Sequence, residues 1–157
     1  MSVFQFYHAQ YNPTGLSGLV GGTRSNTEIN PKLGELFCNT ASYEDTAVTQ
    51  YRKLFVKQEE TATIQNLYLD INEVEYTGQI AFAYTRISGN TAASPVDMPS
   101  GMSGDNFSGN SATPLFLTGT SVASNQYEIW LRLTVPSGAG SDNMASFNLR
   151  AKGARLN

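Results

Sequence analysis

The stretch QYEIWLRLTVP, residues 126–136, shows the most regular alternation of hydrophobic and polar side chains in the chain. One parity carries Tyr127, Ile129, Leu131, Leu133 and Val135, and the other carries Glu128, Trp130, Arg132 and Thr134. Successive side chains of a β-strand point to opposite faces, so this stretch predicts a strand with one face in a hydrophobic core.

Shorter versions of this pattern recur along the chain, at residues 3–11, 50–58, 64–72, 79–87, 114–118 and 146–152. No segment predicts a helix longer than two turns. Short alternating strands separated by Gly-, Ser- and Asn-rich turns are typical of antiparallel all-β proteins. We therefore predict a β-sandwich, jelly-roll or immunoglobulin-like, whose last two strands pair as a hairpin through Gly138–Gly140.

The first 30 residues differ from the rest. The strand Val3–Tyr11 is followed by a glycine-rich stretch with Pro13, which is long for a connection in a compact domain. We interpret residues 1–30 as an extended N-terminal arm and residues 31–157 as the sandwich domain. Within the domain, Gly89–Thr113 has almost no core candidates and predicts a long irregular loop, of the kind that often carries function.

The composition excludes several classes of protein. Of 157 residues, 15% are charged and the net charge is −3, while Ser, Thr, Asn and Gly together fill 57 positions. One Cys and one His preclude an internal disulfide and the zinc motifs built on paired ligands. Without a Lys/Arg cluster, nucleic-acid binding is not expected. The apolar runs are far shorter than the ~20 residues of a membrane span, and no signal-peptide pattern is present. We expect no cofactor and no metal.

None of the candidate catalytic groups has a diagnostic partner. His8 lacks a nucleophile and a carboxylate at recognisable spacing, and Cys38 is expected to pack as a small hydrophobe. The glycine-rich stretch 18–24 lacks the Lys-Ser/Thr ending of a phosphate loop. The carboxylates considered as a hydrolase pair or a calcium site are Glu59, Glu60, Glu73, Glu75, Asp97 and Asp105. They lack the required patterns, so we predict that the chain is not an enzyme.

Trp130 is the outlier of its strand, because it lies on the parity opposite the main hydrophobic face. Three interpretations are open at this point. Trp130 contacts a partner protein, or it packs under a second covered face, or it forms a sugar-stacking platform with Tyr68 and Tyr76.

Several segments occur in an order that resembles a group of small structural proteins of tailed bacteriophages. They are Gly21-Gly22, Leu36-Phe37, Tyr43-Glu44, then YRKLFVK at 51–57, IWLRLTVPSGA at 129–139 and FNLR at 147–150. The similarity extends loosely over residues 20 to 152. Gln58 stands where the group has Asn after its YRK strand, and the segment 89–113 is particular to this chain.

The resemblance implies a virion component, assembled in the host cytoplasm, rather than an activity. We expect a capsid decoration (cement) protein, a homo-oligomer that binds the major capsid protein or other virion proteins. The Val3–Tyr11 strand is expected to add to a neighbour's sheet edge. The predicted contact residues are Val3, Phe4, Phe6, Tyr7, Tyr11 and Trp130. The alternatives are a tail or baseplate protein and a receptor- or carbohydrate-binding module that uses Trp130 and the 89–113 loop.

Overall fold

The computed structural model describes residues 3–29, 47–72, 80–85, 90–110, 112–135, 137 and 148–156. Its elements are β1 (Phe4–Tyr11), β2 (Val20–Glu28), β3 (Val48–Gln58), β4 (Thr63–Asn72), β5 (Ile80–Thr85), β6 (Thr91–Ala92), the 3-10 turn η1 (Gly104–Asn106), β7 (Gly109–Asn110), β8 (Leu115–Ser121), β9 (Gln126–Val135) and β10 (Asn148–Leu156). They confirm the all-β prediction.

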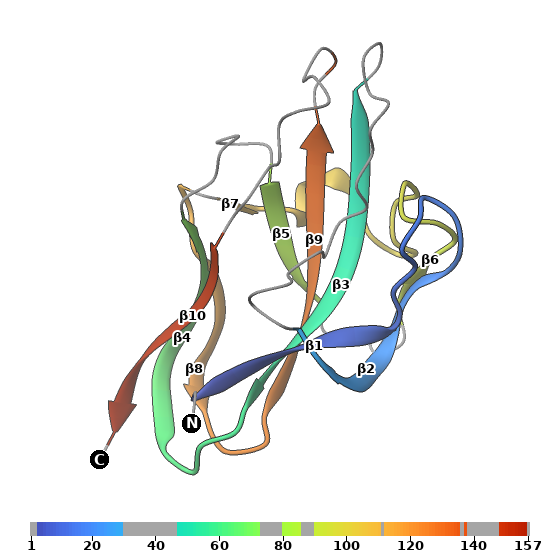
Figure 1. The fold of residues 1–157 in the computed structure, drawn as a ribbon. Helices are drawn as coiled ribbons and strands as arrows, with labels where there is room; N and C mark the ends of the chain where they lie inside the picture. Colours follow the sequence, from blue (N-terminus) through green and yellow to red (C-terminus); the bar gives the residue numbers. More distant parts are fainter. Residues whose placement is uncertain are drawn as a thin grey trace.

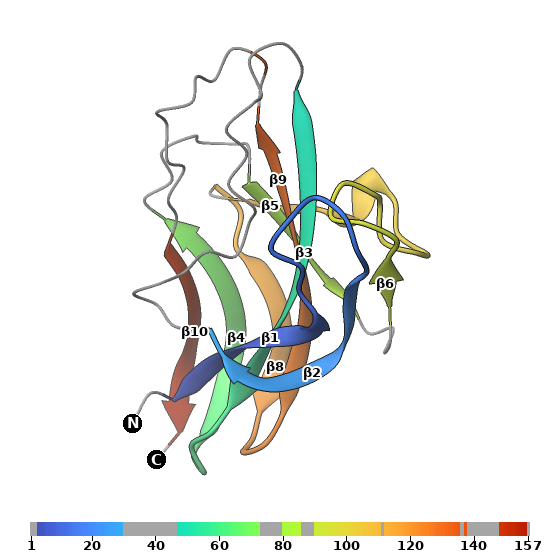
Figure 2. The ribbon, with the colours of Figure 1, turned by 45° about the vertical axis from the view of Figure 1, so that its right-hand side comes forward.

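The strands form two antiparallel sheets (Figure 1). The large sheet has the order β6-β2-β1-β3-β9-β5-β7, and the small sheet has the order β10-β4-β8. The large sheet curls, so that β1 and β2 run across the lower part of β3 (Figures 1 and 2). This arrangement is compatible with the predicted β-sandwich.

The main hydrophobic core lies between the two sheets. It contains the alternating residues of β9 that the sequence pattern singled out, together with side chains from β1, β3, β4 and β8: Phe4, Leu54, Val56, Ile64, Leu67, Leu69, Ile71, Leu117, Tyr127, Ile129, Leu131 and Leu133. Burial of such side chains is the dominant stabilising term of a small domain.

A second hydrophobic cluster lies on the opposite face of the large sheet. It contains Val20, Tyr51, Ala92, Phe107 and Trp130, with Met102 packed against it. β3 and β9 therefore have buried side chains on both faces, and they pair directly with Lys53 opposite Trp130 and Leu54 opposite Ile129. The second cluster is where segment 90–107 attaches to the sheet.

Two expectations about organisation are wrong, and the segment predicted as a long irregular loop contains three short elements. β9 pairs with β3 and β5, and β10 pairs with β4 in the other sheet, so the last two strands do not form a hairpin. β1 and β2 belong to the large sheet and not to an extended arm. Segment 90–110 supplies two core residues, Ala92 and Phe107, and contains β6, η1 and β7.

Candidate contact surface

β1 is an internal strand of the large sheet, and its pairings with β3 and β2 overlap around Tyr7 and His8. It pairs with β3 from Phe4 opposite Gln58 to His8 opposite Leu54, and with β2 from Tyr7 opposite Glu28 to Tyr11 opposite Gly21. The part of a strand that is hydrogen-bonded on both sides cannot add to the sheet of a neighbouring molecule. The pairing therefore leaves less of Val3–Tyr11 open to the expected strand addition, which stays a prediction.

Most of the β1 side chains predicted as contact residues stabilise the chain itself. Phe4 belongs to the main core, and Val3 and Phe6 pack against it while partly buried. The Tyr7 hydroxyl donates a hydrogen bond to Glu59 Oε1 at 2.9 Å. Tyr11, where β1 ends, differs from these four because 38% of its surface is exposed.

Trp130 is completely buried, with 0% of its surface exposed. Its ring lies against Gly21, where an added Cβ atom would come within 3.0 Å of Trp130 Cζ2 and 2.6 Å of the Asn90 carbonyl oxygen. Its predicted roles in partner contact and sugar stacking are therefore wrong, and the alternative of a covered second face is confirmed. The rarity of two-sided burial in an antiparallel sheet explains the misassignment.

Two charged side chains of the YRK motif are also buried. Lys53 is fully buried, and its Nζ atom lies 2.7 Å from Glu128 Oε2 and donates to the Gly22 carbonyl oxygen at 2.9 Å. Arg52 is equally buried and donates through Nη1 to the Tyr51 carbonyl oxygen at 2.9 Å. Because both cations have partners inside the fold, the motif offers no charge to a ligand, and Lys53 joins β3 to β2 and β9.

Exposed hydrophobic side chains gather instead on two loops at one end of the large sheet. Leu16 and Leu19 lie in the β1–β2 connection beside Tyr11, and Val96 and Met98 lie in the connection that follows β6. Val20 pairs with Ala92, which brings the two loops side by side, and Figures 1 and 2 agree on this. We call Tyr11, Leu16, Leu19, Val96 and Met98 the loop surface.

The second of these loops is firmly held by hydrogen bonds. The Tyr51 amide donates to the Pro95 carbonyl oxygen at 2.7 Å, and the Ser100 amide donates to the Thr91 carbonyl oxygen at 2.8 Å. The side chain of Asn90 donates to the Ser100 carbonyl oxygen at 2.6 Å. Exposed Val96 (42%) and Met98 (39%) therefore lie on a well-held backbone. This favours binding, because little conformational entropy of the loop would be lost when a partner binds.

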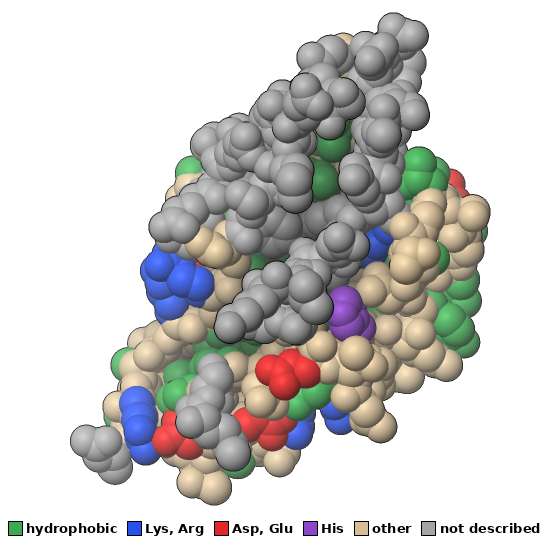
Figure 3. All heavy atoms as spheres, viewed as in Figure 1, with side chains coloured by type: hydrophobic (Ala, Val, Ile, Leu, Met, Phe, Trp, Pro, Cys, Tyr) green, Lys and Arg blue, Asp and Glu red, His purple; other side chains and the backbone are tan. Residues whose placement is uncertain are grey.

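Hydrophobic side chains are visible along the edge of the molecule beside β6 (Figure 3). Leu16, Leu19, Val96 and Met98 were not among the predicted contact residues, because the first segment was interpreted as an extended arm and the second as an irregular loop with almost no core candidates. A usable signal existed, since large hydrophobic side chains are unusual in loops otherwise made of Gly, Ser, Pro, Thr and Asp.

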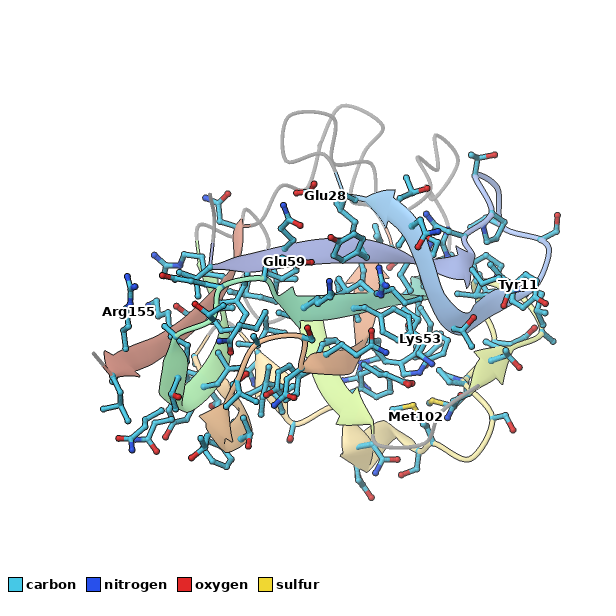
Figure 4. The ribbon with its side chains drawn as sticks, turned by 90° about the horizontal axis from the view of Figure 1, so that it is seen from below. Tyr11, Glu28, Lys53, Glu59, Met102 and Arg155 are labelled. Atoms are coloured by element: carbon cyan, nitrogen blue, oxygen red, sulfur yellow. The ribbon has the colours of Figure 1, made fainter. Side chains whose placement is uncertain are left out.

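The remaining polar candidates that the structure describes do not form a catalytic constellation. Glu59 pairs with Lys57 at 2.7 Å, whereas Glu60 pairs with Arg155 at 2.6 Å, so the two neighbouring carboxylates serve different strands. The hydrogen bond from Lys57, and then that from Tyr7, lowers the pKa of the Glu59 carboxyl. Burial is the main cause that raises the pKa of Tyr7, followed by its bond to Glu59. Glu59 lies beside β1 in Figure 4, whereas Arg155, the partner of Glu60, lies near the end of β10.

His8 is half-buried in β1, and burial lowers the pKa of its imidazole. Asn12 Nδ2 lies 2.8 Å from His8 Nδ1, where the amide can donate to the neutral ring. His8 therefore has a local structural partner. The expectations for Cys38, Glu73, Glu75 and Tyr76 fall outside the described residues.

Neither a metal site nor a membrane-spanning helix is present among the described residues. No group of three or more His, Cys, Asp or Glu side chains there could hold a metal ion, and no described helix is long and apolar enough to cross a membrane. Comparisons with protein-family models, with curated proteins and with solved structures found no match to this chain.

Proposed function

We propose that this chain is a non-enzymatic structural protein of a tailed-bacteriophage particle, and that it binds capsid proteins as a decoration protein. The observation that carries the proposal is the loop surface: hydrophobic side chains on two adjoining loops, one of which is held by hydrogen bonds to the sheet. Exposed hydrophobic patches on a folded protein mark interaction sites.

The phage-like sequence motifs support the proposal through the fold. YRKLFVK lies in β3, IWLRLTV lies in β9 and the end of FNLR lies in β10. These strands supply side chains to both hydrophobic clusters and carry the buried Lys53. The motifs are therefore residues of the framework, which related proteins would share. The loop surface lies outside them, where a partner-specific surface belongs.

The composition of the loop surface suits contact between proteins. Its residues are Tyr, Leu, Val and Met, and interface cores are enriched in aromatic side chains and Met and depleted in Lys and Glu. Each copy that binds the assembled shell and not its dissociated subunits stabilises the shell by mass action. Many such contacts, made by single copies or by a homo-oligomer, reinforce a capsid without any chemical step.

The test is the number and location of copies on the native particle, measured by cryo-electron microscopy. A copy number that matches the capsid lattice, with the loop surface against the shell, supports the proposal. A small number of copies that matches the symmetry of the tail, found on the tail, would indicate a tail or baseplate protein instead of a decoration protein. Absence of the chain from the particle overturns the virion assignment.

A further inference from the structure

The outer face of the small sheet carries an exposed aromatic pair. Tyr68 of β4 and Phe116 of β8 are direct cross-strand neighbours, and their ring centroids lie 5.2 Å apart at an interplanar angle of 62°. Tyr68 is 39% exposed and Phe116 is 50% exposed. Both point away from the main core, since their neighbours Leu67, Leu69 and Leu117 are buried in it.

Charged side chains line up beside this pair. Lys152 of β10 is opposite Tyr68, and Arg150 is opposite Asp70. Lys152 Nζ and Arg150 Nη2 each lie 2.7 Å from the same atom, Asp70 Oδ2. The hydrogen bond from Lys152 is the main cause that lowers the pKa of the Asp70 carboxyl, so Asp70 is ionised at neutral pH. Two cations on one carboxylate leave one positive charge in excess.

The aromatic and charged groups border a shallow hollow of about 200 Å³, lined by Tyr68, Asp70, Pro114 and Lys152. This volume is below the roughly 300–1,000 Å³ of pockets that hold drug-sized ligands. The hollow therefore suits a single ring. We propose that it binds a pyranose unit that carries one negative charge, such as a uronic acid residue of a polysaccharide.

The chemistry of the lining matches the two kinds of surface on a sugar. The C–H face of a pyranose is apolar and packs against an aromatic ring, here Tyr68, whose neighbour Phe116 extends the apolar surface. The sugar hydroxyl groups both donate and accept hydrogen bonds. Asp70 accepts only and Lys152 donates only, so both kinds of hydroxyl partner line the hollow, and Arg150 lies next to it, opposite Asp70.

The excess positive charge selects an acidic sugar over a neutral one. The side chains of Lys152 and Arg150 are 55% and 44% exposed, while that of Asp70 is 13% exposed. Exposed ion pairs are weak, so the Lys152 ammonium group can turn towards a ligand carboxylate while Arg150 keeps Asp70 paired. Because these groups are near the surface, binding is expected to weaken as the salt concentration rises.

The experiment compares oligosaccharides that end in glucuronic acid with matched ones that end in glucose, which differ only by the carboxylate. Binding is measured by NMR titration of the full-length protein, after an array of acidic and neutral saccharides has selected the probes. Lys152→Gln is expected to lower affinity for the glucuronic acid probe about tenfold, towards that for glucose. Tyr68→Ala is expected to lower both affinities by about tenfold or more.

Arg155→Gln is the matched control, because Arg155 is also a cation of β10 but pairs with Glu60 away from the hollow. It should leave binding unchanged, and thermal unfolding should show that all three variants are folded. The proposal is overturned if no acidic saccharide binds at millimolar concentration, if Lys152→Gln and Arg155→Gln act alike, or if an acidic peptide binds the hollow and saccharides do not. The result of this experiment is independent of the decoration proposal, because that proposal depends on the loop surface and not on the hollow.

Discussion

Lys53 Nζ lies 2.7 Å from Glu128 Oε2, and the lysine side chain is completely buried. The two residues are on neighbouring strands, β3 and β9. The same ammonium group donates to the Gly22 carbonyl oxygen of β2 and, at 3.5 Å, to that of Asn90. One charged side chain thus joins three strands of the large sheet and the start of the segment that supports the loop surface.

Removal of the Glu128 carboxylate alone should therefore lower the free energy of unfolding more than removal of both charges of the Lys53–Glu128 pair. Glu128→Gln leaves a buried ammonium ion without a counter-charge, and we expect the free energy of unfolding to fall by about 3 kcal/mol. Lys53→Met with Glu128→Gln should cost less than Glu128→Gln alone, because the double variant buries no unpaired charge.

Urea unfolding of both single variants and the double variant gives the coupling energy between the two residues. Additive losses would show that Lys53 and Glu128 do not stabilise each other in solution, and that the carbonyl oxygens alone hold the lysine.

Gly21 should not tolerate a side chain. Its φ is +102°, and an added Cβ atom would meet the Asn90 carbonyl oxygen at 2.6 Å. We expect Gly21→Ala to lower the free energy of unfolding by more than about 2 kcal/mol, the backbone strain and the clash acting together. Gly101 also has a positive φ, +76°, but an added Cβ atom there would meet open space. Gly101→Ala therefore measures the backbone strain without a clash.

Gly119→Ala is the second control, since nothing lies within 4 Å of its added Cβ atom. Chemical denaturation should rank the losses in the order Gly21, Gly101, Gly119. Equal losses at Gly21 and Gly101 would mean that the contact between Gly21 and the Trp130 region is not tight.

The main core can be tested at Leu131, which is fully buried in β9. Leu131→Ala should cost about 2–5 kcal/mol, because the deleted methyl groups leave a cavity between the sheets. Leu156→Ala, at a side chain that is 45% exposed, should cost far less. A loss below about 1 kcal/mol at Leu131 in a denaturant melt would place β9 with the wrong face inward.

His8 gives the protein a pH dependence in a window where no other side chain has its ordinary pKa. Burial lowers the pKa of the folded-state imidazole, so below about pH 6.5 the unfolded chain binds the proton more readily. Stability should therefore fall as the pH decreases from 6.5 through the folded-state pKa.

Because His8 is the single histidine, His8→Gln should flatten the stability curve between pH 7 and pH 5. NMR titration of the wild-type imidazole should give a pKa below 6.5. A value above 6.5, or an unchanged curve in His8→Gln, would show that burial does not govern this residue.

The strand pattern of the sequence was a good guide to where strands lie and to which of their side chains enter the main core. Residues 126–136 predicted β9 and its inward face, and 64–72 predicted most of β4. The same pattern failed at Trp130, because alternation assigns one parity to solvent while β9 is covered on both sides.

Sequence patterns also missed features that depend on backbone pairing. β2, which reads VGGTRSNTE, has almost no hydrophobic period and is held by its pairing with β1 and β6. Its position in turn places β1 inside the sheet, which no property of Val3–Tyr11 alone reveals. For this reason deletion of residues 1–11 would remove a strand of the large sheet and take Phe4 out of the core, so it is expected to lower stability.

The candidate surfaces were predictable only in part. Tyr11 was predicted as a contact residue and is exposed, and Tyr68 was one of the candidate stacking residues and is exposed. The residues that complete each surface come from distant segments: the connection after β6, which the Val20–Ala92 pair brings close, and, for Tyr68, Phe116 and Lys152. Such proximity is set by sheet order and register, which a single sequence does not contain.

The most direct test of the central claim is the occupancy of phage particles that have been assembled without this protein and then incubated with purified variants. The variant Leu19→Ser/Val96→Ser/Met98→Ser is compared with Val122→Ser/Leu156→Ser, which changes equally exposed hydrophobic residues elsewhere. We predict that the loop-surface variant loses at least about tenfold in affinity, while the control variant binds like the wild type. Wild-type occupancy by the loop-surface variant would contradict the account.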